Sequence, residues 1–180
     1  MSETSTTGAD AANSGDVIDL IRADHREFER LFGLLRDRGE DRASRLRELA
    51  DLLVAHALAE ESEVYPKLRL HAPEEREEIE HSVEEHAEGN EALARLQMVS
   101  DVTSRQFDQA LDELVEAVTH HIEEEERDVL EPARESVPER TRYEIGGAFM
   151  TARLGWLKTG AGAPEKVRDL LGEYRDRGLV

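Results

Sequence analysis

The chain of 180 residues contains no cysteine and few aromatic residues. The absence of cysteine excludes disulfide bonds, cysteine-ligated zinc, iron–sulfur clusters and cysteine nucleophiles. Aromatic residues make up 4% of the chain, whereas charged residues reach 36%. Such a composition, rich in Ala, Leu, Glu and Arg, favours helices over sheets. We therefore expect an all-α protein.

Long apolar runs and basic patches are also missing. No apolar run approaches the roughly 20 residues that span a bilayer. The N-terminal stretch has neither the basic patch nor the apolar core of a signal peptide. The formal net charge of −19 repels nucleic acid and anionic lipid. These features predict a soluble, cytoplasmic protein with no nucleic acid and no membrane among its partners.

Four apolar stripes with helical spacing follow a small, polar tail, residues 1–15, which we expect to be disordered. The stripes predict helices at about residues 17–38, 41–70, 73–99 and 104–135. Because short loops join these long amphipathic helices, residues 16–135 are expected to form an up-down-up-down four-helix bundle.

Residues 136–180 predict a C-terminal helical extension. A fifth helix, weakened by Gly146 and Gly147, is followed by the linker "KTGAGAP" and a short amphipathic helix. This extension either covers the bundle or docks a protein partner, a second copy of the chain included. Covering the bundle is the more ordinary arrangement.

The seven histidines separate into two groups. Helical periodicity places one histidine of each bundle helix on its apolar stripe: His25, His56, His86 and His121. His81 and His120 share faces with acidic residues, and His71 ends the second helix. At roughly 1.5 Å per residue, the inward histidines lie at heights that agree within about a turn. Antiparallel packing should bring their imidazoles into one layer.

Two inward histidines begin a His-x-x-x-Glu motif, His56 with Glu60 and His121 with Glu125. Residues four apart share a helix face, and buried carboxylates without partners are very unfavourable. A single inward histidine is more often an ordinary core residue, but the conjunction favours a metal centre. Four nitrogens and two carboxylates exceed a tetrahedral zinc site and suit iron or manganese, with two ions bridged by the carboxylates.

At these residues the chain resembles the hemerythrin-like, or HHE cation-binding, family. The matching stretches, within about residues 16–135, are "DLIRADHREFERLF", "LLVAHALAEESEVYPKL", "SVEEHAEGNEALARL" and "VTHHIEEEERDVLEP". The resemblance implies a four-helix bundle with a non-haem di-iron centre, oxo- or hydroxo-bridged, in which Glu60 and Glu125 bridge the irons. The implied metal ligands are His25, His56, Glu60, His86, His121 and Glu125. The rival ferritin-like pattern needs Glu-x-x-His on two helices, and only Glu78–His81 fits.

One position departs from the family pattern. Oxygen-carrying hemerythrins use two histidines four apart on the third helix, whereas here Ser82 stands four before His86. His81 lies about 140° away by helical rotation and is a poor substitute. The loss of this ligand argues against simple oxygen carriage and favours an open position on one iron.

Three more residues lie beside the predicted ligands in sequence. Glu61 and Glu126 are either additional donors or hydrogen-bond partners for the ligand N–H groups. Tyr65 follows His56 at a spacing that points its side chain away from the site. We therefore leave Tyr65 out of the predicted site.

Three functional hypotheses remain open. The resemblance implies roles in dioxygen binding, oxygen or iron sensing, peroxide and nitric oxide handling, and iron–sulfur repair. The first hypothesis is a di-iron protein that binds or reacts with dioxygen, peroxide or nitric oxide in sensing or stress protection, with or without enzymatic turnover. The second is a non-catalytic, metal-dependent interaction or iron-handling module in which residues 138–180 report the state of the bundle. The third is a metal-free acidic bundle with a binding role only.

Overall fold

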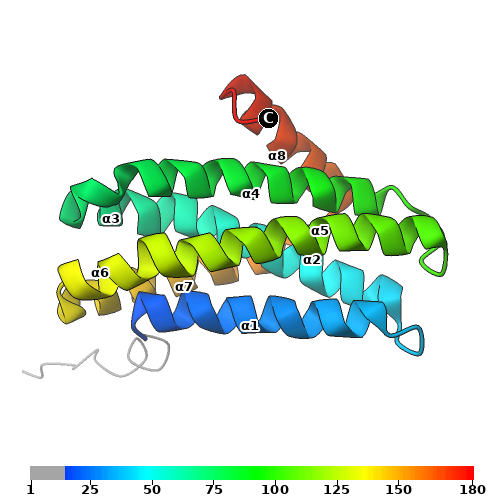
Figure 1. Cartoon of the computed structure of the whole chain (residues 1–180), viewed down its shortest axis with the longest axis horizontal. Helices are drawn as coiled ribbons and strands as arrows, with labels where there is room; N and C mark the ends of the chain where they lie inside the picture. Colours follow the sequence, from blue (N-terminus) through cyan, green and yellow to red (C-terminus); the bar gives the residue numbers. More distant parts are fainter. Residues whose placement is uncertain (1–14) are drawn as a thin grey trace, which may run out of the picture.

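The computed structural model describes residues 15–180, which form helices and no strand. Four long helices lie side by side in antiparallel order (Figure 1): α1 (Val17–Arg36), α2 (Arg42–Ala59), α4 (Arg76–Gln97) and α5 (Arg105–Glu124). The predicted all-α helical bundle is confirmed. The predicted disordered tail, residues 1–15, lies outside the described residues except for Gly15. None of the described helices is long and apolar enough to cross a membrane.

Side-chain caps fix the starts of three bundle helices. Asp16 accepts a hydrogen bond from the backbone N–H of Ile18 at 3.0 Å, and Asp41 does the same for Ser44 at 3.1 Å. Ser104 caps α5 through its hydroxyl oxygen. These side chains satisfy N–H groups that have no partner within the helix. The helix starts therefore fall within a residue of the starts predicted from the sequence at 17, 41 and 104.

Two of the predicted helices are not continuous, which corrects the sequence interpretation. A π-helical segment, η1 (Glu60–Val64), separates α2 from α3 (Tyr65–His71), and a second, η3 (Glu125–Leu130), separates α5 from α6 (Glu131–Ser136). Pro66 and Pro132 follow the two π segments and cannot donate an α-helical hydrogen bond back into them. Each π turn holds an extra residue and so changes which side chains face the core.

The third predicted helix, 73–99, is also shorter at both ends. It begins with a 3₁₀ turn, η2 (Pro73–Glu75), before α4 starts at Arg76, and α4 ends at Gln97. The proline at the first position of the turn lacks an N–H group that would have no partner there in any case. This difference moves no residue of the site.

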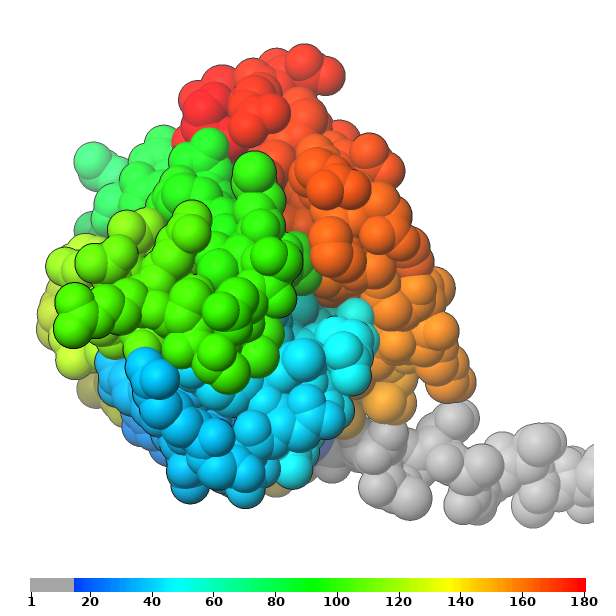
Figure 2. Space-filling view, turned by 90° about the vertical axis from the view of Figure 1, so that its right-hand side faces the viewer, coloured from blue at the N-terminus to red at the C-terminus, as the bar shows by residue number. Residues whose placement is uncertain are grey.

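The C-terminal extension covers one side of the bundle. Helix α7 (Glu139–Thr159) is continuous through both of its central glycines and packs against α1, α2 and η1, whereas α8 (Pro164–Asp176) packs against α4. Figure 2 shows both helices, in orange and red, along the same side of the molecule. A Cβ atom at Gly162 would lie 2.1 Å from the backbone of Ala50. Glycine thus lets the α7–α8 linker lie directly on α2.

The core consists of two apolar clusters with a polar layer between them. Along α1, for example, Ile18 and Ile21 belong to one cluster, Phe28 and Leu31 belong to the other, and His25 stands between. The same division recurs on α2 around His56 and on α4 around His86. Buried polar groups need partners, so this layer is where the sequence departs from ordinary core packing and where a functional site is to be sought.

Candidate metal centre

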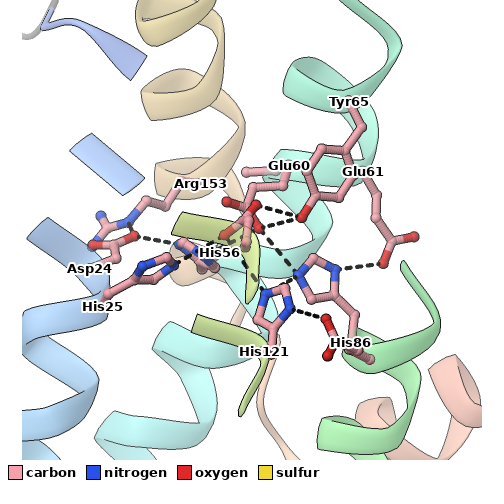
Figure 3. A network of polar contacts seen from close by, with 12 residues as sticks. Asp24, His25, His56, Glu60, Glu61, Tyr65, His86, His121 and Arg153 are labelled. Atoms are coloured by element: carbon pink, nitrogen blue, oxygen red, sulfur yellow. Dashed lines mark hydrogen bonds and ion pairs between the residues drawn. The ribbon is translucent and has the colours of Figure 1, made fainter. Parts of the chain in front are cut away.

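All six residues that the sequence predicts as metal ligands meet in the polar layer between the apolar clusters. Figure 3 shows His25, His56, Glu60, His86 and His121 directed toward one another. They come from α1, from the junction of α2 and η1, from α4, and from the junction of α5 and η3. Their exposed fractions are low: His25 0%, His56 2%, Glu60 0%, His86 6%, His121 7% and Glu125 0%. The helical periodicity of the sequence therefore placed the four imidazoles correctly inside the bundle.

Their donor atoms form two groups that share Glu60. The four-donor cluster consists of His25, His56, Glu60 and Glu125, and the three-donor cluster of Glu60, His86 and His121. In the first, His25 Nε2 lies 3.3 Å from Glu125 Oε2, and His56 Nε2 lies 3.2 Å from Glu60 Oε2. In the second, His86 Nε2 lies 3.2 Å from Glu60 Oε2 and 3.1 Å from His121 Nε2.

Several of these inward atoms are buried without a hydrogen-bond partner. They are Nε2 of His25, Nε2 of His56, Oε1 of Glu60 and Oε2 of Glu125. A buried polar atom left without a partner costs about 1–3 kcal/mol, and more if it is charged. A cation between the imidazole nitrogens and the carboxylate oxygens would satisfy all four atoms at once. The donor set is therefore suited to a metal ion.

The outer nitrogen of each imidazole, Nδ1, lies within hydrogen-bond distance of a carboxylate. Nδ1 of His25 lies 2.9 Å from Glu126, and Nδ1 of His86 lies 3.3 Å from Glu61. These two acids thus act as hydrogen-bond partners of the imidazoles, the second of the alternatives that the sequence left open. A carboxylate at Nδ1 keeps the proton on that atom and leaves the lone pair of Nε2 directed inward.

The other two outer carboxylates were missed in the sequence. Asp24 lies 3.0 Å from Nδ1 of His56, and Glu85 lies 3.0 Å from Nδ1 of His121. A signal for them existed, because each of the four acids is the immediate neighbour of a predicted ligand on one helix and serves a histidine of another helix. In so acidic a chain, however, an acid beside a ligand is not by itself distinctive.

The C-terminal extension supports two of these carboxylates. Arg153 of α7 donates two hydrogen bonds of 2.6 Å to Asp24. The hydroxyl group of Tyr174, on α8, donates to Glu61 at 2.7 Å. Phe149 of α7 presents its ring edge-on to His56, with the ring centroids 5.8 Å apart. The extension therefore reaches the polar layer from outside, a role that the sequence did not reveal.

Tyr65 points into the site, so its exclusion from the predicted site was wrong. The tyrosine is 1% exposed, and its hydroxyl group donates to Glu125 at 2.7 Å and lies 3.3 Å from Glu60. A straight helix would have turned it away. The extra residue of η1 rotates everything after it by about 100°, which brings Tyr65 inward.

Comparison with known protein families now adds an independent line of support. The family model described as the hemerythrin HHE cation binding domain matches residues 16–133. The chain belongs to this family. No curated protein and no solved structure matches the chain significantly. The match ends before α7, so Arg153 and Tyr174 lie outside the matched part of this hemerythrin HHE protein.

The charges of the site strongly perturb the titration of this hemerythrin HHE domain. Burial lowers the pKa of His56, but Glu60 and Asp24 outweigh burial and raise it to about 10. For His86, Glu60 and Glu61 likewise outweigh burial and raise the pKa to about 9. Burial raises the pKa of Glu60, yet the two histidines hold it well below its usual range. Protons thus balance the carboxylates in the metal-free site, and a metal ion must displace them.

For two other groups, His121 and Tyr65, burial shifts the pKa toward the uncharged form. Burial lowers the pKa of His121, and the adjacent His86 adds to this effect, while Glu85 opposes it. The two imidazoles face each other through their Nε2 atoms, so one proton serves both. Burial, together with the charges of Glu125 and Glu60, raises the pKa of Tyr65 well above its usual value. Tyr65 therefore stays a protonated hydrogen-bond donor.

A small cavity adjoins the three-donor cluster. Its volume is about 30 Å³, which is room for roughly two water-sized molecules. Its lining is mostly apolar and includes Phe28, Leu53, Gly89, Leu93 and Val118, together with His86 and His121 of the three-donor cluster and His56 of the four-donor cluster. Ser82, which stands where a further histidine would serve this cluster, is buried, but its hydroxyl group donates to the backbone of Glu78. The cavity therefore meets both histidines of the cluster with fewer protein donors, and one histidine of the other cluster.

Proposed function

We propose that this hemerythrin HHE protein binds two iron ions and uses them to bind or react with dioxygen or a small oxidant such as peroxide or nitric oxide, in sensing or stress protection. The four-donor cluster would hold one ion and the three-donor cluster the other, with Glu60 donating to both and Glu125, from η3, donating within the four-donor cluster. The observation that carries this proposal is the set of buried imidazole and carboxylate atoms without partners. Mixed nitrogen and oxygen donors suit iron or manganese.

The asymmetry of the two clusters supports a small ligand. An ion in the three-donor cluster would have fewer protein donors, as reactive metal sites do. The cavity beside it is too small for an organic substrate, since ligand pockets for such molecules are about ten times larger. Iron, when bound, would supply the electrons for chemistry with the oxidant.

The chain's own residues would hold that chemistry in place. The carboxylates on Nδ1 fix the tautomer and orientation of the imidazoles. Apolar residues such as Leu53 and Val118 limit water beside the three-donor cluster. The hydroxyl group of Tyr65 donates to Glu125 and lies close to Glu60, and so helps to hold the two inner carboxylates in position.

Iron loading followed by optical spectroscopy tests the proposal. The full chain, loaded with ferrous iron without oxygen and then oxidised, is expected to contain two iron ions and to change its visible spectrum when azide or peroxide is added. Loss of added peroxide, measured separately, distinguishes turnover from binding. Less than one iron per chain, or a spectrum indifferent to both anions, would overturn the proposal.

A pair of glycine variants tests the role of the cavity. Gly89→Ala places a methyl group in the cavity, 3.9 Å from Val118, and is expected to weaken azide binding at least tenfold while leaving the iron content unchanged. Gly33→Ala is the matched control, because a Cβ there meets nothing within 4 Å. Both changes remove a helical glycine and stabilise the helix by up to about 1 kcal/mol. Equal azide affinity in the two variants would contradict the cavity as the ligand site.

A metal-dependent interaction module is the second candidate function. It is favoured by the contacts of Arg153 and Tyr174, which link the extension to carboxylates of the site. Under this function, removal of the metal changes the rate at which a protease cleaves residues 138–180. An unchanged digestion pattern would exclude it. A metal-free role would be favoured if purified protein held less than one equivalent of metal and alanine at both His56 and Glu60 left stability unchanged.

A further inference from the structure

Two more His-x-x-x-Glu pairs lie outside the inner centre. His81 and Glu85 stand on α4, and His120 and Glu124 stand on α5. Because these antiparallel helices pack directly against each other, the two pairs meet on the surface of the bundle. In the sequence both histidines fall on acidic faces, which is typical of solvated positions, and the structure confirms that His81 is 49% and His120 63% exposed along their side chains.

Donor atoms of His81, Glu85 and Glu124 all lie within 4.8 Å of one another, and His120 approaches both carboxylates from α5. Nε2 of His81 lies 3.3 Å from Glu124 and 3.8 Å from Oε1 of Glu85. Nε2 of His120 lies 3.7 Å from the same Oε1 atom and 3.7 Å from Glu124. Around a tetrahedral ion with bonds of about 2.0–2.1 Å, ligand atoms stand about 3.3 Å apart. Small side-chain movements would therefore complete a coordination shell of two nitrogens and two oxygens.

A buried oxygen of Glu85 provides a second, independent observation that points to a ligand between these side chains. The residue is 6% exposed, and its Oε2 atom is held by Nδ1 of His121 at 3.0 Å. Its Oε1 atom is buried without a hydrogen-bond partner and is directed at the two exposed histidines. Their distances to it are too long for hydrogen bonds, so an ordinary surface ion pair does not account for this buried oxygen.

We propose that His81, Glu85, His120 and Glu124 form an outer site for one divalent transition-metal ion, of which Zn²⁺ is the representative. Two imidazoles and two carboxylates are donors that tetrahedral Zn²⁺ accepts. The exposure of the histidines gives the ion direct access from solvent, and the net charge of −19 raises the local concentration of cations. The outer site shares no donor atom with the inner centre.

Glu85 connects the outer site to the inner centre, and this step rests on the proposed function. An ion bound to Oε1 withdraws charge from the carboxylate, which weakens the hydrogen bond from Oε2 to the imidazole of His121. A weaker partner at Nδ1 makes that imidazole a poorer ligand. Occupancy of the outer site is therefore expected to shift the visible spectrum of the iron-loaded, azide-treated protein.

Calorimetric titration of Zn²⁺ into the iron-loaded full chain tests the outer site. One saturable equivalent is expected, and the double variant His81→Ala/His120→Ala is expected to lose at least tenfold in affinity. His71→Ala, at another exposed histidine beyond the cluster, should bind Zn²⁺ like the parent protein. Identical titration of the parent and the double variant, or the absence of saturable binding to the parent, would overturn the site.

Iron analysis of the same samples separates the outer site from the proposed function. Iron retained at the end of each titration shows that Zn²⁺ has not replaced it, and far-UV circular dichroism verifies the fold of the variants. Glu124→Gln, which removes a charged donor at a partly exposed position, should weaken Zn²⁺ binding without changing the iron content. Zn²⁺ binding without a spectral shift would leave the outer site standing and overturn its connection to His121.

Discussion

The four-donor and three-donor clusters share Glu60 but differ in their surroundings. The first is closed by Phe28 and Phe149, and its histidines are at most 2% exposed. The second lines the cavity with both of its histidines and reaches toward the surface through Glu85, whereas the first contributes only His56 to the cavity. The same sequence motif serves both clusters, so the neighbouring helices decide which cluster is saturated with protein donors and which is open.

The second His-x-x-x-Glu motif makes this difference by dividing its donors. His121 belongs to the three-donor cluster, whereas its partner Glu125 lies 3.3 Å from His25 and 3.8 Å from His121. The first motif places both of its donors, His56 and Glu60, in the four-donor cluster. Glu125 thus lies with the histidines of the other cluster, and the three-donor cluster has one donor fewer.

Removing the carboxylate that the two clusters share is expected to impair metal binding at both of them. Glu60→Gln keeps the shape of the side chain but removes the charge that serves both clusters, so iron content should fall below one equivalent per chain. Metal analysis after reconstitution measures this. Glu63→Gln, in the same π segment and paired with Lys67 alone among the charged groups of residues 15–180, should retain two iron ions. Two ions in the Glu60 variant would contradict the shared role.

Removing a donor from the open cluster should affect one ion only. His121→Ala leaves the four-donor cluster complete, so one iron per chain is expected to remain, and the response to azide should be lost. His120→Ala changes the adjacent, exposed residue and should keep both ions. A His121 variant that binds either two ions or none would show that the clusters are not independent in this sense.

The pH dependence of iron affinity should differ between the two clusters, because metal binding displaces protons from each of them. Affinity is expected to rise about tenfold per pH unit for each displaced proton. It should level off near pH 9 for the cluster of His86 and near pH 10 for that of His56. Competition with a chelator from pH 6 to 10 measures both limits.

The same protons stabilise the metal-free protein. The direction of the histidine pKa shifts decides whether this stability rises or falls with pH. Both histidine pKa values lie above the ordinary value of 6.5, so this stabilisation is complete below pH 6.5. It is lost as the pH rises through 9 to 10. Thermal melts of metal-free protein should show the decline, which iron-loaded protein should lack. A flat profile would argue against protonated histidines in the metal-free site.

The smallest expected effect concerns the hydroxyl group that joins the two inner carboxylates. Tyr65→Phe leaves an oxygen of Glu125 without its donor, and should destabilise the metal-free protein by about 1–3 kcal/mol. Tyr143→Phe removes a hydroxyl group from a residue that is 44% exposed and should change stability by no more than about 0.5 kcal/mol. Urea unfolding of both variants makes the comparison. Equal stabilities would show that Tyr65 is not part of the inner network.

The inner residues were predictable because burial and periodicity act locally. A histidine that continues the apolar stripe of a long helix is expected to face the core, and His25, His56, His86 and His121 all do. Tyr65 was not predictable from a straight helix, because the π turn before it changes the rotation of the chain. Arg153 was not predictable because only the packing of α7 on the bundle brings it to Asp24.

The contacts of α7 and α8 also bear on how the site could be moved between proteins. A fragment that stops at residue 133, where the family match ends, would strip Asp24 of its guanidinium partner and Glu61 of its phenol partner, and would uncover the side of His56. Anyone who transplants this centre into another helical scaffold must therefore carry the last two helices along, or design replacements for them.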